Sequence, residues 1–290
     1  MTTDRPVWAF AIGLVAFDVL AVWWLGWSVD AGPLLPLLVL VGALLAIRFV
    51  AARDPKLARV ASVCDALACL AVLINAAWIA TYVGATTGAP LRDHELAAAD
   101  RAIGFSWTAW AAWSAAHPTF HAVTRWAYPQ HIWQSVLLVG VLAWRREASP
   151  LLRALAVAFT VTLVVSALAP AIGTESDAVW EPTFAALQRG TFHQIDAATP
   201  QGLISLPSFH AVLATLFLLG WWSVPWARWP ALALNLLILV ATVRWGAHYL
   251  VDVIAGVLVA LVAAWVVGMP AFGYRRNGIG ILIRPSFAAR

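Results

Sequence analysis

Long apolar runs separated by short polar segments follow one another along most of the chain. A helix needs about 20 predominantly apolar residues to cross the hydrocarbon core of a bilayer. Runs of about this length cover approximately residues 6–27, 33–50, 59–83, 123–144, 151–170, 207–222, 226–243 and 248–267. The pattern therefore predicts an all-α fold, a polytopic membrane helix bundle with about eight transmembrane helices.

The segment between the third and fourth runs has a different pattern. Residues 84–122 are polar at first and then aromatic, with Trp107, Trp110 and Trp113 at helical spacing. An amphipathic helix of this kind commonly lies in the membrane interface. We therefore expect a surface helix between the third and fourth transmembrane helices.

Composition agrees with a membrane protein and argues against a nucleic-acid partner. Hydrophobic residues make up 62% of the chain and charged residues 11%, against about 45–50% and about 25% in soluble domains. Many of the 18 tryptophans lie near the ends of apolar runs, as in the aromatic belts of membrane proteins. The net charge of +4 is spread over short loops without a basic stripe. Cys64 and Cys69 lie within one apolar run, which does not indicate a disulfide framework or a zinc site.

The distribution of Lys and Arg predicts the orientation in the membrane. If the N-terminus is cytoplasmic, thirteen of the 18 basic residues fall on the cytoplasmic side, as the positive-inside rule requires. The five on the outer side are Arg92, Arg101, Arg125, Arg189 and Arg244. The N-terminal residues lack the basic leader and cleavage site of a signal peptide, so we expect the first run to remain as a span. The sequence thus predicts a multi-pass protein of the cell membrane with both termini in the cytoplasm.

The runs also suggest three parts. Residues 1–58 would form two N-terminal transmembrane helices, residues 59–270 a catalytic domain of six helices, and residues 271–290 a basic cytoplasmic tail. In the predicted orientation, the runs that begin at residues 207 and 248 both start at the outer face. Two polar sites far apart in the sequence would then share one side of the membrane.

The first polar site is the sequence Ser-Leu-Pro-Ser-Phe-His at residues 205–210, directly before an apolar run. Proline among serines is typical of a helix start. A helix N-terminus offers free amides and the positive end of the helix dipole, which suit a phosphate. Ser208 adds a hydroxyl group there, and His210 stands one turn into the helix, at the edge of the membrane. Ordinary helix capping and a tolerated interfacial histidine are the alternative for these residues.

The second polar site contains His248 and Asp252, four residues apart. This spacing predicts that both side chains lie on one helix face, where the carboxylate can accept the imidazole proton. The other ring nitrogen is then free to attack an electrophile. An unpaired charge within an apolar span is costly, which favours a paired and functional Asp252. Because one straight helix over residues 226–267 would greatly exceed the bilayer thickness, we expect the chain to reverse at Gly246, with Arg244 and His248 facing a common pocket.

A further group of polar residues lies near the start of the fourth run. Tyr128, Gln130, His131 and Gln134 could bind the polar head of a substrate, and Tyr128 and His131 are the candidates we retain for substrate binding. The alternative is hydrogen bonding between helices, which is the commoner use of such residues in membrane proteins.

The two sites together resemble the type 2 phosphatidic acid phosphatase superfamily. The resemblance rests on Pro-Ser-x-His at residues 207–210 and His-x-x-x-Asp at residues 248–252, and covers roughly residues 151–267. The sequence Ala-Thr-Val, followed by Gly-x-His-Tyr-x-x-Asp, is similar to the branch that contains inositol phosphorylceramide synthases. The resemblance implies that His248 is the nucleophile that forms a phosphohistidine, that Asp252 orients it and that His210 protonates the leaving oxygen. It also implies that Ser208 holds phosphate oxygens and that no metal or cofactor is needed.

The chain departs from the family pattern in its cations. The usual Lys-x6-Arg-Pro element is absent, since Lys56 is the only lysine, and Thr242 occupies the place of the usual arginine before the nucleophilic histidine. Arg244 is our candidate substitute, and Arg189 and Arg125 are further outer-face cations that could neutralise a phosphate.

The resulting hypothesis is a membrane phosphatase or phosphotransferase. Its substrate would be a lipid phosphate or lipid pyrophosphate, and the acceptor either water or an alcohol such as inositol or another sugar. A transporter or channel with an ion relay through Asp18, Asp65, Asp252 and His131 is one alternative. A metal site formed by His210, His248 and Asp252 is another.

Overall fold

The chain is described by a computed structural model over residues 5–30, 32–174, 177–198 and 202–269. The described residues are largely α-helical, which confirms the predicted fold class. The helices are α1 (Arg5–Trp24), α2 (Leu35–Ala51), α3 (Ala58–Gly84), α4 (Asp93–Ala102), α5 (Trp107–Ala116), α6 (Pro118–Ala127), α7 (Gln130–Trp144), α8 (Ala148–Leu168), α9 (Asp177–Gln188), α10 (Phe209–Trp222), α11 (Arg228–Trp245) and α12 (Leu250–Val266). Short 3-10 helices are η1 (Gly32–Leu34), η2 (Pro55–Leu57) and η3 (Ala85–Thr87).

Four helical segments are long and apolar enough to cross a membrane. They are Arg5–Trp24, Gly32–Ala51, Pro55–Thr87 and Ala148–Leu168. The helices α10 and α12 are apolar but shorter. These segments support a membrane protein, whereas the number of eight spans and the three-part division of the chain stay predictions. The expected tail at residues 271–290 lies outside the described residues.

The expected single span over residues 123–144 is wrong. The chain forms α6 and α7 instead, and Pro129 is the N-cap residue of α7. Proline lacks the amide hydrogen that a continuous helix needs, and its ring clashes with the carbonyl of the preceding turn. The break places Tyr128 at the end of one helix and His131 in the first turn of the next.

The segment expected to form one surface helix contains two complete helices, α4 and α5, and the start of α6. The side chain of Ser106 accepts a hydrogen bond of 3.3 Å from the amide of Ala109 and so caps α5. Of the three tryptophans, Trp107 is buried, and its indole nitrogen donates to the carbonyl of Val243 over 2.9 Å. This bond fastens α5 to the end of α11.

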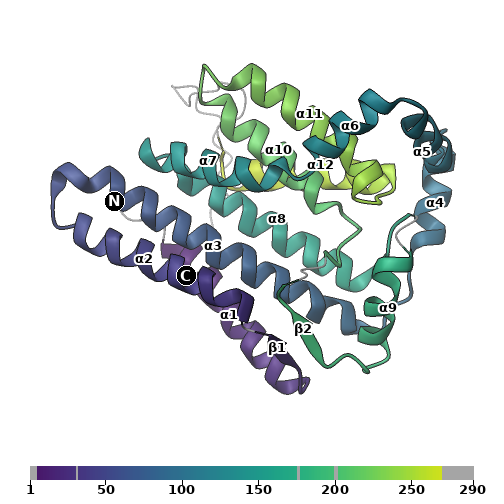
Figure 1. Cartoon of the computed structure of the whole chain (residues 1–290), viewed down its shortest axis with the longest axis horizontal. Helices are drawn as coiled ribbons and strands as arrows, with labels where there is room; N and C mark the ends of the chain where they lie inside the picture. The colour runs from purple at the N-terminus through teal and green to yellow at the C-terminus, as the bar shows by residue number, and fades with distance from the viewer. Residues whose placement is uncertain (1–4, 31, 175–176, 199–201, 270–290) are drawn as a thin grey trace, which may run out of the picture.

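Two groups of helices share the core (Figure 1). The long helix α3 packs against α1, α2, α7 and α8, whereas α10 packs against α7, α8, α11 and α12. Many core positions are alanine, such as Ala154 and Ala158 of α8, and small residues let membrane helices approach closely. The helices α4, α5 and α6 lie together at one end of the molecule (Figure 1). The predicted reversal at Gly246 is confirmed, because α11 ends at Trp245 and α12 begins at Leu250.

Two features tie the N-terminal helices to the rest of the chain. The strands β1 (Ser28–Asp30) and β2 (Gln194–Asp196) form a short parallel pair that the hydropathy pattern did not predict. In the core, Asp65 of α3 forms an ion pair of 2.7 Å with Arg48 of α2 and accepts a hydrogen bond of 3.2 Å from the indole of Trp8 in α1. Asp65 therefore links α1, α2 and α3, and the ion relay through this residue stays a prediction.

Candidate active site

The two predicted sites meet in one pocket. His210 lies in the first turn of α10 and His248 in the loop between α11 and α12, and their ring centroids are 6.3 Å apart. Both histidines line a cavity of about 300 Å³. The other lining residues are Tyr128, Ala171, Ile172, Phe184, Gly202, Leu203, Ile204, Ser205, Trp245 and Gly246.

His248 and Asp252 form the expected pair, although not on one helix. Because α12 begins at Leu250, His248 precedes the helix, and Tyr249 is the N-cap residue. The His248 Nδ1 atom lies 3.5 Å from Oδ2 of Asp252. This separation is longer than an ordinary N–H···O hydrogen bond, and such bonds often tighten when substrate is bound. The pairing directs Nδ1 toward the carboxylate and leaves Nε2 as the nitrogen that can react.

The Asp252 carboxylate is fully buried and held from two further sides. Its Oδ2 atom accepts a hydrogen bond of 2.9 Å from the hydroxyl of Ser205 and one of 3.2 Å from the amide of Tyr249. The latter bond belongs to a capping box at the start of α12. Such contacts fix the orientation of a carboxylate before the reaction begins. Ser205 also lines the pocket, and it was missed by the sequence analysis, which selected Ser208.

Ser208 is the N-cap residue of α10. Its side chain accepts a hydrogen bond of 3.4 Å from the amide of Ala211, and the residue is fully buried. Its own amide donates to the backbone carbonyl of Asp252 over 3.0 Å. Ser208 does not line the pocket, so the structure places it as a contact between α10 and α12. Gly256 makes this contact possible, since a Cβ atom there would overlap the Ser208 carbonyl oxygen.

A buried carboxylate from α4 caps the start of α12. Asp100 accepts hydrogen bonds of 2.9 Å from the amides of both Leu250 and Val251. The first amides of a helix have no partner within the helix, and a negative charge at this end also interacts favourably with the helix dipole. Asp100 thus fixes the position at which α12 begins, two residues after His248.

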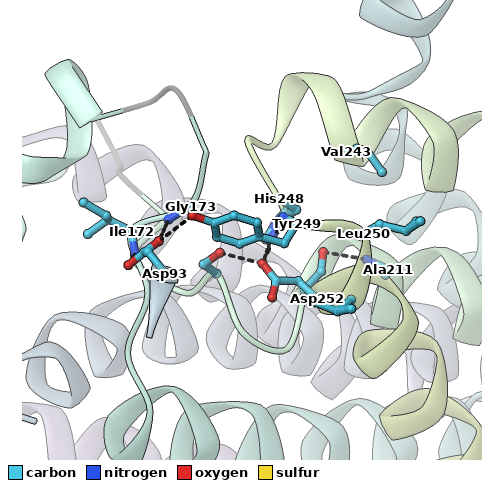
Figure 2. A network of polar contacts seen from close by, with 12 residues as sticks. Asp93, Ile172, Gly173, Ala211, Val243, His248, Tyr249, Leu250 and Asp252 are labelled. Atoms are coloured by element: carbon cyan, nitrogen blue, oxygen red, sulfur yellow. Dashed lines mark hydrogen bonds and ion pairs between the residues drawn. The ribbon is translucent and has the colours of Figure 1, made fainter. Parts of the chain in front are cut away.

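A second carboxylate from α4 holds the loop on the other side of Tyr249 (Figure 2). Asp93 accepts hydrogen bonds from the amides of Ile172 and Gly173 at 3.2 and 2.9 Å, and from the hydroxyl of Tyr249 at 3.3 Å. Burial raises the pKa of Asp93 above its ordinary value, although these hydrogen bonds lower it in part. Gly173 has φ +90° and touches the carbonyl of Ala247, where a Cβ atom would not fit.

The sequence reasoning missed the role of Asp93 and Asp100. They are seven residues apart, which places both on one face of α4. Two acidic residues at this spacing, next to apolar residues, could have predicted that both carboxylates lie on the side of α4 that packs against the protein. Their partners, however, lie 79 to 156 residues further along the chain.

Tyr128 and His131 lie beside His210. The ring of Tyr128 stacks on His210 with centroids 4.6 Å apart, and His131 meets His210 edge-on at 4.6 Å. The Nδ1 atom of His131 is 2.9 Å from the carbonyl of Tyr128, which can only accept a hydrogen bond, so a neutral His131 has an unprotonated Nε2. Gln134 instead forms hydrogen bonds between helices, since it exchanges bonds of 2.8 and 3.1 Å with Asn235 of α11.

The three predicted cations lie in different places. The guanidinium groups of Arg244 and Arg125 both lie 5.6 Å from the ring centroid of Trp245, which lines the pocket. Arg244 also lies over Trp107 at 5.4 Å. Arg189 is exposed beyond the end of α9 and does not line the pocket. Among the described lining residues there is no Lys or Arg, so the expectation that Arg244 faces a common pocket with His248 is wrong. Arg244 and Arg125 instead contact the ring of Trp245.

The polar groups of the pocket suit nucleophilic attack by a histidine nitrogen and proton donation by a second histidine. One histidine has a buried carboxylate behind it and the other lies across the cavity. Within the described residues, no group of three or more His, Cys, Asp or Glu side chains has the arrangement of a metal site.

Comparisons with known proteins agree with this geometry. A family profile described as the PAP2 superfamily matches residues 94–266, which include α4 except Asp93 and also include His210 and His248. A search of curated proteins and a search of solved structures gave no match. The family match implies phosphatase or phosphotransferase chemistry and association with a membrane. Since it covers more than half of the 290 residues, the chain belongs to the PAP2 superfamily.

Proposed function

We propose that this protein is a membrane-embedded enzyme that cleaves a lipid-linked phosphate through a phosphohistidine intermediate on His248. The observation that carries the proposal is the buried pair of His248 and Asp252, with His210 across a shared cavity. Asp252 would keep Nε2 of His248 unprotonated and stabilise the charge that develops on the ring.

In the first half-reaction, Nε2 of His248 attacks phosphorus and the bond between phosphorus and the leaving oxygen breaks. His210, in its protonated form, donates a proton to that oxygen, so that an alcohol or a phosphate leaves. Tyr128 and His131 contact the His210 ring and would hold it toward the leaving group.

Several elements are available to hold the phosphate oxygens. His210 brings the start of α10 to the pocket, where the positive end of the helix dipole favours an anion. The corresponding amides of α12 at Leu250 and Val251 already bind Asp100. Arg244 and Arg125 add positive charge near Trp245, whereas Arg189 would need to move to take part.

The second half-reaction transfers the phosphoryl group from His248 to an acceptor. Water would make the enzyme a lipid phosphate or pyrophosphate phosphatase. An alcohol such as inositol or another sugar would make it a transferase, as the resemblance to inositol phosphorylceramide synthases suggests. The Lys and Arg distribution supports a site at the outer face of the cell membrane, with both termini in the cytoplasm.

The intermediate can be detected directly. The purified protein would be incubated with a panel of lipid phosphates, quenched, and analysed by peptide mass spectrometry for phosphate on His248. The expected result is a phosphorylated His248 in the wild type and no such adduct in His248→Ala. Both His248→Ala and His210→Ala should lose turnover. Full turnover by a folded His248→Ala protein would refute the mechanism.

The acceptor requires a second assay. Release of free phosphate would be followed with and without inositol and other sugars. A hydrolase releases phosphate regardless of the added alcohol, whereas a transferase forms a phosphorylated alcohol at the expense of free phosphate. Turnover in detergent, where no ion gradient exists, would also exclude transport as the sole activity.

A further inference from the structure

A second cavity opens beside the catalytic pocket. It has a volume of about 280 Å³ and shares four lining residues with the pocket: Gly202, Leu203, Ile204 and His210. The two cavities therefore meet at the edge of His210. One is lined by the polar groups of the proposed reaction, and the other is mainly apolar.

The apolar cavity is enclosed by four helices. The helix α3 contributes Leu73, Ala77 and Thr81, and α7, α8 and α10 contribute the other helical walls. Its described lining contains no Asp, Glu, Lys or Arg. A cavity of this composition suits a hydrocarbon chain, because apolar surface is best buried against apolar walls.

One wall lies outside the part of the chain that matches the family. The match begins at residue 94, whereas α3 ends at Gly84. The helix α3 therefore lies outside the matched segment, yet it supplies Leu73, Ala77 and Thr81 to the wall of the cavity.

We propose that this cavity binds the hydrocarbon chain of the leaving alcohol and that α3 sets the chain selectivity. The inference rests on the proposed function, because it uses His210 as the proton donor to the leaving oxygen. His210 lies where the two cavities meet. With phosphorus beside His248 and the leaving oxygen beside His210, the group attached to that oxygen extends into the apolar cavity.

This arrangement determines which part of the substrate remains on the enzyme. The bond between His248 Nε2 and phosphorus forms, and the bond between phosphorus and the oxygen of the apolar alcohol breaks. The proton of His210 moves to that oxygen, and a neutral lipid alcohol is released into the membrane. The group left on His248 contains phosphorus and its other substituents but no hydrocarbon chain from this cavity.

The selectivity can be tested with two substrates that differ only in chain length. Ala77→Leu on α3 and Ser135→Leu on α7 each place a larger side chain at the cavity wall. We expect each variant to lower the ratio of kcat/KM for hexadecyl phosphate to kcat/KM for butyl phosphate by about tenfold, since small changes in an apolar pocket discriminate chains to that extent. Ala71→Leu, on the same helix but outside the cavity, is the matched control and should keep the wild-type ratio.

Two outcomes separate this inference from the proposed function. If the wild type turns over neither substrate and no adduct forms on His248, the proposed function fails. If the wild type turns over both and the two cavity variants keep the wild-type ratio, only the chain site is refuted. Mass spectrometry gives an independent check, because an adduct on His248 that retains the hexadecyl chain would contradict the orientation of the substrate.

Discussion

Ser205 donates a hydrogen bond of 2.9 Å to Oδ2 of Asp252, the same oxygen that faces His248. The bond joins the segment before α10 to α12 and holds the carboxylate beside His248. Both residues are buried, so the bond is not exchanged with bulk water. Because Ser205 acts on His248 through Asp252, it is a positioning residue for the proposed reaction.

Ser205→Ala should lower kcat about tenfold with a smaller effect on KM. A hydrogen bond to a charged group contributes about 1.5–3 kcal/mol, and each 1.4 kcal/mol of transition-state stabilisation corresponds to about tenfold in rate. Steady-state kinetics would measure the effect. Ser205→Thr keeps the hydroxyl group and should recover much of the rate. Equal losses in both variants would indicate a packing defect in place of a positioning role.

Asp100→Ala should destabilise the protein by about 1–2 kcal/mol, because two amides at the start of α12 lose their acceptor. Thermal unfolding in detergent would measure the loss, and activity should fall because His248 directly precedes this helix start. Glu95→Ala is the control, since Glu95 lies on the same helix but its side chain is 55% exposed. A similar loss in both variants would contradict the capping role.

Gly256→Ala should separate α12 from the start of α10. The new methyl group would overlap the Ser208 carbonyl, and overpacking of this kind costs about 1–3 kcal/mol. We expect a lower unfolding temperature and reduced turnover. Gly140→Ala on α7 meets no atom within 4 Å and should be neutral or slightly stabilising. An unchanged unfolding temperature for Gly256→Ala would show that the two helices are not this close.

Asp93 predicts a pH dependence of stability. Because burial raises its pKa in the folded state, folding favours the protonated form. Its stabilising contribution is complete below the pKa of an unfolded Asp, about 3.9, and decreases as pH rises through the folded pKa. Asp93→Asn removes this titration.

The unfolding free energy of the wild type minus that of Asp93→Asn should therefore decrease as pH rises from about 4, the ordinary Asp pKa, and then level off. Chemical denaturation at a series of pH values would give this difference. A difference that increases with pH would mean that the hydrogen bonds from Ile172, Gly173 and Tyr249 outweigh burial.

Local patterns in the sequence determined much of the architecture. Apolar runs predicted the membrane helices, and their combined length across residues 226–267 required the reversal that occurs at Gly246. The spacing of His248 and Asp252 brought them together even though His248 precedes the helix, because a capping box holds the first turn. Pro129 also indicated a helix break, but the hydropathy of residues 123–144 led to the prediction of one continuous span.

Only the tertiary structure decided which polar residues serve the site. Asp93 binds the loop before α9, and Asp100 binds the start of α12. Gln134 pairs with Asn235, whereas His131, three residues earlier, contacts His210. Ser208 was selected in the sequence analysis and Ser205 was given no role, yet Ser208 caps α10 and Ser205 holds Asp252. Hydropathy and helical spacing act over a few residues, so they determine local structure. The partner of a buried polar group depends on which helices pack together, and no local pattern contains that information.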